Sequence, residues 1–230
     1  MTTVLVAGGG GGVGEGIVRA WLHAGATVAT LSRSTERLQS LTEMSQGLPG
    51  RLVARKGAAG ASGHLEALLS EVGQVDQAVA SIGGGGWRLA PLMTIEEAMF
   101  RRIVDDAVVA HWATAKAVLP RVAADGEYVF INGGAALHTV KGAEPMSLVA
   151  RTQLAMADLI AGEVAPGPRV TSLVLNSPII ARNRPTGRPE WLTADDVGQA
   201  CLYLRAQAEL PRQIVITTRA DVDALARDVQ

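Results

Sequence analysis

The chain is poor in three features that define other classes of protein: cysteine, aromatic side chains and net charge. Its 230 residues include a single cysteine, Cys201, which excludes an internal disulfide, and no spacing of Cys and His typical of a metal site occurs. With 21 basic and 22 acidic side chains the formal net charge is −1, so nothing in the composition attracts nucleic acid or an anionic membrane. We therefore expect no metal, no nucleic-acid partner and a reducing compartment.

Long hydrophobic runs are also missing. The N-terminal segment, residues 1–7, has no basic leader and its apolar run is too short for a signal peptide. No later run reaches the ~18 apolar residues that a membrane-spanning helix needs. These absences predict a soluble, cytoplasmic protein without a membrane partner.

Aliphatic residues and 26 glycines take the place of the missing aromatics. Short aliphatic segments typical of buried strands alternate with segments of helical periodicity. The strand segments are residues 3–7, 27–31, 51–54, 77–81, 128–132, 170–175 and 213–217. The helical segments are residues 13–23, 34–44, 62–72, 95–122, 145–164 and 193–208. Because parallel strands need crossover connections, the alternation predicts an α/β protein: a single doubly wound Rossmann-type domain over residues 1–230, with a seven-stranded, mostly parallel sheet flanked by helices on both faces.

A glycine-rich turn follows the first predicted strand. Seven of the eleven residues from 7 to 17 are glycine, and an amphipathic helix comes next. Glycine permits a tight turn and a close backbone approach to a pyrophosphate, and the helix N-terminus offers free N–H groups to the phosphates. The position between first strand and first helix predicts a dinucleotide site, formed by Gly8, Gly10, Gly11, Gly12, Val13 and Gly14.

The end of the second predicted strand bears on the choice of cofactor. NAD-binding folds usually place an acidic residue there for the ribose 2′-hydroxyl, whereas an arginine accommodates a 2′-phosphate. Here the strand ends in Ser32 and Arg33, with no acid at its tip. We predict NADP(H) rather than NAD(H), the alternative being that Arg33 is a solvated surface residue.

The order of these motifs resembles the short-chain dehydrogenase/reductase family over nearly the whole chain. Residues 7–14 are similar to the family's Thr-Gly-x-x-x-Gly-Ile-Gly, and residues 79–84 occupy its Asn-Asn-Ala-Gly position without either asparagine. Residues 116–120, 126–132 and 168–174 resemble the end of the family's long helix and two later strands, and Pro178 stands at its Pro-Gly position. The resemblance implies further cofactor contacts from Ser81, Ile82, Gly83, Arg151, Pro178 and Ile180.

The family's catalytic residues are an Asn, a Ser and a Tyr-x-x-x-Lys pair, and the resemblance places other residues at all four positions. They fall on Ala107, Gly133, Ser147 and Arg151. The chain has only two tyrosines, Tyr128 and Tyr203, and neither precedes a Lys or Arg by four residues. Positioned acid–base catalysis contributes about 10² to 10⁴ in rate, so ordinary carbonyl reduction is expected to be slow.

Replacement chemistry has three candidates. His138 lies in the loop where the family's substrate is bound and is the best candidate proton donor, because histidine is the usual acid–base residue near neutral pH; the alternative is a surface histidine. Ser147 and Arg151 remain at the family's positions, although a serine hydroxyl lacks the acidity of a phenol and a guanidinium does not release its proton. Trp87, Trp191 and the arginines of residues 182–188 could contact substrate or phosphate, and His111 is expected at a subunit interface.

The glycine-rich turn and the replaced catalytic residues are consistent with two functions. The first is an NADP(H)-dependent oxidoreductase acting on a small-molecule substrate that needs no tyrosine proton donor. The second is a catalytically degenerate protein that binds NADP(H) as a sensor, partner subunit or non-redox enzyme. A homodimer or homotetramer is expected through the long fifth and sixth helices, which carry small and apolar residues.

Overall fold

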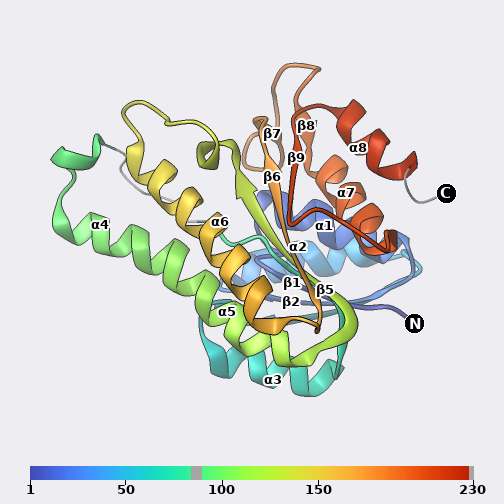
Figure 1. The fold of residues 1–230 in the computed structure, drawn as a ribbon. Helices are drawn as coiled ribbons and strands as arrows, with labels where there is room; N and C mark the ends of the chain where they lie inside the picture. Colours follow the sequence, from blue (N-terminus) through green and yellow to red (C-terminus); the bar gives the residue numbers. More distant parts are fainter. Residues whose placement is uncertain (84–89, 228–230) are drawn as a thin grey trace.

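A seven-stranded sheet forms the centre of the molecule (Figure 1). The computed structural model describes residues 1–83 and 90–227. The strands of the sheet are β1 (Thr3–Ala7), β2 (Thr27–Ser32), β3 (Arg51–Lys56), β4 (Val75–Ala80), β5 (Val122–Gly133), β6 (Arg169–Leu175) and β9 (Gln213–Ile216). Their order is β3-β2-β1-β4-β5-β6-β9, and every pair of neighbours is parallel. The predicted doubly wound α/β fold is confirmed.

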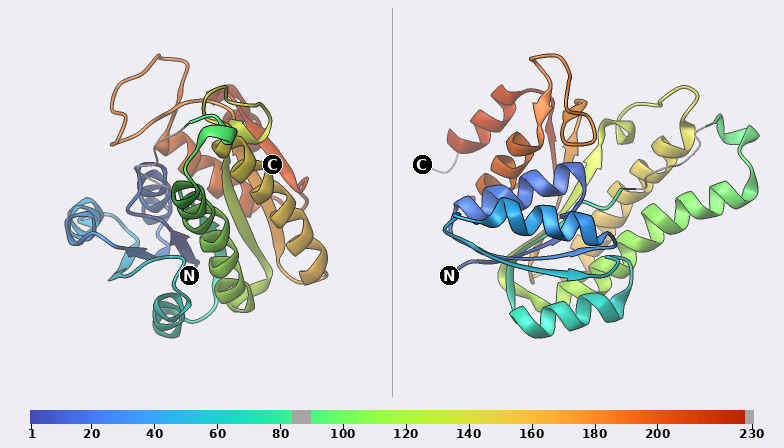
Figure 2. Two further views of the ribbon diagram at one scale, coloured as in Figure 1. Left: turned by 90° about the vertical axis from the view of Figure 1, so that its left-hand side faces the viewer. Right: turned by 180° about the vertical axis from the view of Figure 1, so that it is seen from behind.

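Helices cover both faces of this sheet (Figures 1 and 2). On one face lie α1 (Gly12–His23), α2 (Thr35–Ser45), α7 (Ala194–Ala206) and α8 (Arg219–Arg227). On the other lie α3 (Ser62–Val72), α5 (Ala110–Val118) and α6 (Glu144–Val164). Strand β1 serves both layers, because Val4 and Val6 pack toward the first set of helices while Leu5 and Ala7 pack toward the second. This two-sided burial explains why the strand reads as an unbroken apolar run.

The predicted helix over residues 95–122 is wrong in its boundaries and its regularity. Helix α4 (Glu97–Val104) continues into a π-helical segment, Asp105–Val109, and then into α5. A short 3₁₀ turn, Leu119–Arg121, contains Pro120 and ends the helix, because proline cannot donate to the preceding turn. Strand β5 therefore starts at Val122, earlier than predicted.

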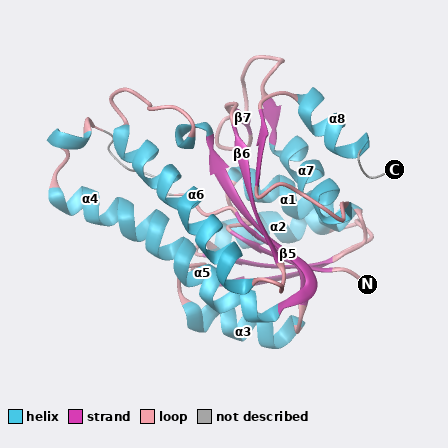
Figure 3. Cartoon of the chain, in the orientation of Figure 1, coloured by secondary structure: helices cyan, strands magenta, loops and turns pink. Residues whose placement is uncertain are grey.

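The segment after β6 is more ordered than its sequence suggests. Two short strands form there: β7 (Ile179–Ile180) pairs in parallel with β8 (Leu192–Thr193). Near the C-terminus, α8 packs against α7 and contributes Val222 to the same core cluster. None of the helices in the described ranges is both long and apolar enough to span a bilayer. Figure 3 shows the loops that follow β5 and β6 at the same end of the sheet.

Candidate cofactor and substrate site

The glycine-rich turn lies where the strand order reverses, between β1 and β4. In open α/β sheets this switch point leaves a crevice at the carboxyl ends of the strands. The segments that follow β1 and β4, both predicted to bind the cofactor, lie in close contact. A Cβ on Gly8 would lie 2.2 Å from the Ser81 carbonyl oxygen. Because Gly8 also has φ +90°, no other residue fits there without strain.

The turn presents the start of α1 to the crevice. The N–H of Gly11 donates to the Gly8 carbonyl at 2.8 Å, which closes the turn. Gly14 packs so closely on it that a Cβ would lie 2.2 Å from the Gly8 oxygen. The N-cap residue, Gly11, makes no side-chain cap, so the N–H groups of the first helical turn remain available to an anion. These observations fit a bound pyrophosphate.

The loop after β6 lies against this turn. Arg182 donates from Nε to Glu15 at 2.7 Å and from Nη2 to the Gly10 carbonyl at 3.0 Å. A Cβ on Gly12 would lie 2.1 Å from Asn183 Oδ1, so the Asn183 amide sits directly over the first residue of α1. Arg182 thus offsets the one carboxylate, Glu15, in the first turn of a helix expected to hold phosphate. Sequence reasoning missed Asn183, because nothing in a polar loop marks which residue folds back.

The other predicted residues of this loop lie at its start. Pro178 is exposed and Ile180 is half-buried at the end of β7. Trp191, proposed as a wall for substrate, packs against Gly187 and lies beneath the Arg184 guanidinium at 5.9 Å. The second such tryptophan, Trp87, lies outside the described residues.

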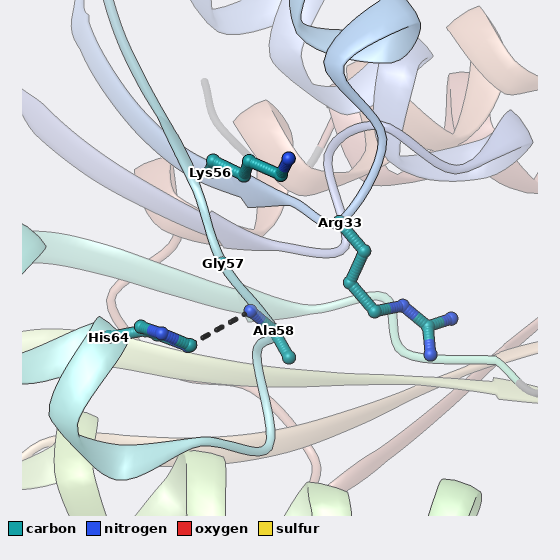
Figure 4. Close-up of a pocket in the computed structure, with 5 residues that line it drawn as sticks. All are labelled: Arg33, Lys56, Gly57, Ala58 and His64. Carbon is teal, nitrogen blue, oxygen red and sulfur yellow. Dashed lines mark hydrogen bonds between the residues drawn. The ribbon is translucent and has the colours of Figure 1, made fainter.

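An open pocket of about 430 Å³ lies beside the ends of β2 and β3. Its described lining consists of Arg33, Lys56, Gly57, Ala58 and His64, so three basic side chains and no carboxylate face it (Figure 4). The Ala58 N–H donates to His64 Nδ1 at 3.3 Å, which fixes the ring at the pocket wall. Ser32, the other residue predicted at this strand end, is buried and accepts the N–H of Ser34 at 3.3 Å. Sequence reasoning found Arg33 but missed Lys56 and His64, which meet it only because β3 pairs with β2.

The Ser147 hydroxyl is hydrogen-bonded to the backbone of the loop that precedes α6. The residue is 2% exposed near the start of α6, where it donates to the His138 carbonyl at 3.2 Å and accepts the Val140 N–H at 3.0 Å. Arg151, one turn later, is exposed and donates to the Thr139 hydroxyl at 3.0 Å. Both candidates therefore hold residues 138–140, which follow β5.

His138 differs from these two residues. Its backbone is held by a hydrogen bond to the Gly134 carbonyl, but its side chain is exposed and makes no hydrogen bond to the described part of the chain. Of the three candidates, it is the one whose side chain makes no hydrogen bond to the described residues. The remaining two positions carry no polar side chain: Gly133 ends β5, and Ala107 lies in the π-helical segment, where Gln153 donates to its carbonyl at 3.1 Å.

Neither of the two tyrosines can replace the family's catalytic tyrosine. Tyr128 is completely buried in β5, where burial raises its pKa above the ordinary phenol value, so its hydroxyl is not an acid near neutral pH. Tyr203 lies on α7, on the other face of the sheet from the core that contains Tyr128, and is partly buried there. No cluster of three or more potential metal ligands occurs within residues 1–83 and 90–227.

The expectation that His111 lies at a subunit interface is wrong. Its ring is 0% exposed, stacked on Phe130 at 5.7 Å between centroids, and its Nε2 lies 2.8 Å from the Ile82 carbonyl oxygen. The histidine belongs to the interior beside the cofactor crevice. Burial lowers its pKa, so the ring is neutral at neutral pH.

Comparison with solved structures places this arrangement among known proteins. A short-chain type dehydrogenase/reductase from Mycobacterium ulcerans superposes with a TM-score of 0.83 at 20% identity, covering 96% of this chain and 90% of that one. An alcohol dehydrogenase from Thermococcus sibiricus, complexed with 5-hydroxy-NADP, has a TM-score of 0.77 at 19% identity, covering 95% and 97%.

A third solved structure has the same fold. The NADPH-bound short chain oxidoreductase from Pseudomonas aeruginosa PAO1, which contains an atypical catalytic center, has a TM-score of 0.81 at 20% identity, covering 94% of this chain and 95% of that one. No curated protein sequence matches the chain. The family model for short chain dehydrogenases matches residues 2–147, well over half of the sequence. By its sequence and its fold, the chain belongs to the short-chain dehydrogenase/reductase family.

Proposed function

We propose that the protein is an NADP(H)-dependent oxidoreductase that transfers hydride to or from a small organic substrate without a Tyr-Lys acid–base pair. The observation that carries this proposal is a set of three features at the carboxyl ends of the strands. An uncapped helix N-terminus, a glycine turn with no room for side chains and a basic pocket lie along the carboxyl ends of β1, β2 and β4. A nicotinamide dinucleotide has phosphate groups for the first and third of these features.

Different segments of the chain would bind different parts of the cofactor. The turn from Gly8 to Gly14 and the α1 N-terminus would hold the pyrophosphate, with Asn183 as a side-chain partner. Ser81, Ile82 and Gly83 would line the opposite wall, as the family resemblance implies. The bound cofactor supplies or accepts the hydride, whereas the protein supplies binding, orientation and electrostatics.

The preference for NADP(H) rests on charge. Arg33, Lys56 and His64 surround a pocket whose described lining has no acidic group. A 2′-phosphate gains charge-assisted hydrogen bonds from such groups, while a ribose 2′-hydroxyl has no carboxylate to accept its proton. Two of the similar structures, one complexed with 5-hydroxy-NADP and one bound to NADPH, support this choice of cofactor.

The reaction half of the site limits the substrate. The Ser147 hydroxyl is hydrogen-bonded to the 138–140 backbone, and a guanidinium such as that of Arg151 is a poor proton donor. Acceptors whose reduction needs no strong acid from the protein therefore suit the site best: an activated alkene, an iminium, or a group protonated by His138 or water. His138 is the candidate proton donor, since its ring is exposed in the loop after β5.

The test is a comparison of hydride acceptors with purified protein and NADPH. We expect turnover of activated alkenes or iminium compounds, with simple ketones slower by about 10² to 10⁴. Where the product needs a proton from His138, His138→Ala should lower turnover by about 10² and leave NADPH affinity unchanged. His23→Ala is the matched control, because His23 is an exposed histidine at the end of α1, remote in the sequence from the loop. Rapid reduction of simple ketones would contradict the proposal.

The second candidate function is NADP(H) binding without turnover, as a sensor, partner subunit or non-redox enzyme. The hydrogen bonds that commit Ser147 and Arg151 to the 138–140 loop favour it. Tight NADPH binding together with no oxidation of NADPH by any acceptor class would support this candidate over the first.

We further propose a homodimer or homotetramer through α5 and α6, which lie side by side on one flank of the sheet (Figures 1 and 2). Several large apolar side chains are exposed on these helices and at the end of the π-helical segment before α5, namely Val109 at 45%, Trp112 at 50%, Leu148 at 39% and Leu159 at 67%. Exposed apolar patches of this kind mark protein interfaces. A monomeric mass by light scattering at working concentration would contradict the assembly, and Leu159→Glu is expected to shift an oligomer toward smaller species.

A further inference from the structure

His111 occupies an unusual position for a buried histidine, because it joins a helix of the second layer to the wall of the cofactor crevice. It lies on α5, is 0% exposed and stacks on Phe130 of β5. Its Nε2 lies 2.8 Å from the Ile82 carbonyl oxygen. Since a carbonyl oxygen can only accept, the Nε2 atom carries the proton and donates.

The peptide that His111 holds is in direct contact with the glycine-rich turn. A Cβ on Gly8 would lie 2.2 Å from the Ser81 carbonyl oxygen and 3.6 Å from the Ile82 nitrogen. The Ser81 N–H donates to the Ala7 carbonyl at 2.8 Å, which ties the same segment to the end of β1. A displacement of the Ile82 peptide would therefore reach Gly8, because close-packed backbone transmits small shifts.

The same helix also holds the loop after β3. The Thr114 hydroxyl, one turn beyond His111, is shared between the carbonyls of Ala59 at 2.9 Å and Ala110 at 2.7 Å. Ala59 follows Ala58, which lines the basic pocket. One face of α5 thus fixes two separate loops of the crevice through buried side-chain hydrogen bonds.

We infer that His111 is a positioning residue for cofactor binding, which holds the Ser81–Ile82–Gly83 segment against the glycine-rich turn through its hydrogen bond to Ile82. The inference rests on the proposed function, because the segment is expected to line the NADP(H) site. His111 touches neither cofactor nor substrate in this account. Its effect passes through the backbone of Ile82.

Three variants separate this role from packing. His111→Gln keeps a neutral N–H donor at the same number of bonds from the backbone as Nε2, and His111→Leu removes it. Val118→Ala is the matched control: Val118 is 0% exposed on the same helix and packs in the core layer of Phe130. A cavity there lowers stability without touching the crevice. If His111→Leu does not fold, His111→Asn replaces it, since its amide is one bond too short to reach Ile82.

Two measurements are made on each variant: NADPH affinity by nicotinamide fluorescence, and amide hydrogen exchange of residues 79–83 without nucleotide. We expect His111→Leu to weaken NADPH binding by about tenfold, the equivalent of one lost hydrogen bond, and to speed exchange in that segment. His111→Gln should restore both properties toward wild type. Val118→Ala should lower the melting temperature and change neither.

Equal affinity and equal exchange in wild type and His111→Leu would overturn the inference, as would an identical loss in His111→Leu and Val118→Ala. A wild-type protein that binds no nicotinamide nucleotide would overturn the proposed function and the part of the inference that concerns cofactor. The exchange measurement needs no nucleotide, so it decides separately whether His111 holds the segment.

Discussion

The proposed site has two halves, one for the cofactor and one for the reaction, and they hold their positions by different means. In the cofactor half, the backbone itself makes the close contacts, with Gly8 against Ser81 and Gly14 against Gly8. In the reaction half, side chains make them, and Ser147 and Arg151 are bonded to the loop that follows β5. Backbone contacts of the first kind tolerate no larger residue, whereas a side chain can be replaced while the loop stays in place. A family fold can therefore retain nucleotide binding while its acid–base chemistry changes.

The largest expected effect is a test of the backbone contacts. Gly14→Ala would place a Cβ 2.2 Å from the Gly8 carbonyl, so the turn must open. We expect NADPH affinity to fall by about 100-fold or more, because the α1 N–H groups lose their alignment with the turn. Gly162→Ala is the control: Gly162 is also helical but has open space around its Cβ position, and the change should stabilise the protein by about 0.5–1 kcal/mol. Equal NADPH affinity in the two variants would break the comparison.

The next effect concerns the basic pocket. Arg33→Ala should weaken NADPH binding by about 10- to 100-fold, as expected for a charge-assisted hydrogen bond, and leave NADH binding nearly unchanged. Arg55→Ala provides the control, because the Arg55 side chain pairs with Glu71 on α3 instead of lining the pocket. Calorimetric titration of both variants with both nucleotides measures the difference. A parallel loss for NADPH and NADH would show that Arg33 acts on the fold and not on the 2′-phosphate.

A substitution of Ser147 is expected to have a smaller effect, and on stability instead of on NADPH binding. Ser147→Ala removes one donor and one acceptor for the 138–140 backbone, so we expect the free energy of unfolding to fall by about 1–3 kcal/mol. NADPH affinity and the turnover of any accepted substrate should stay within a factor of a few. Denaturant unfolding and steady-state kinetics check these results. A stable variant that has lost turnover would assign Ser147 a chemical role instead.

The smallest effect is a pH dependence. Burial lowers the pKa of His111 below its ordinary value of 6.5, so below pH 6.5 the unfolded chain takes up a proton that the folded chain refuses. The free energy of unfolding should therefore decrease with falling pH, by up to about 1.4 kcal/mol per unit, until the folded pKa is reached. His111→Gln should remove this contribution. An unchanged pH slope in that variant would contradict the buried, neutral state of the ring.

The sequence predicted the sheet well, because periodicity and glycine placement are local properties. Strand β1 and helix α3 have the predicted bounds, and the turn between β1 and α1 lies at the switch point. The boundary of β5 was missed because Val122 follows directly on a helix that Pro120 ends. Helical periodicity is judged over many residues, so a transition this short is missed and the predicted helix extends too far.

Much of the site could not be predicted, because it depends on contacts between distant segments. Lys56 and His64 meet Arg33 only after β3 pairs with β2 and α3 folds back. The use of Ser147 as a loop anchor depends on the path of residues 138–140, which carries no periodic signal. From the sequence, His111 was expected at a subunit interface, and only tertiary packing places it behind Ile82.

The most direct test of the central claim is a titration of the wild-type protein with NADPH and NADH under identical conditions. The account predicts saturable binding of both, with NADPH tighter by about tenfold or more, because only its 2′-phosphate reaches Arg33 and Lys56. Binding of neither nucleotide, or equal affinity for the two, would contradict it.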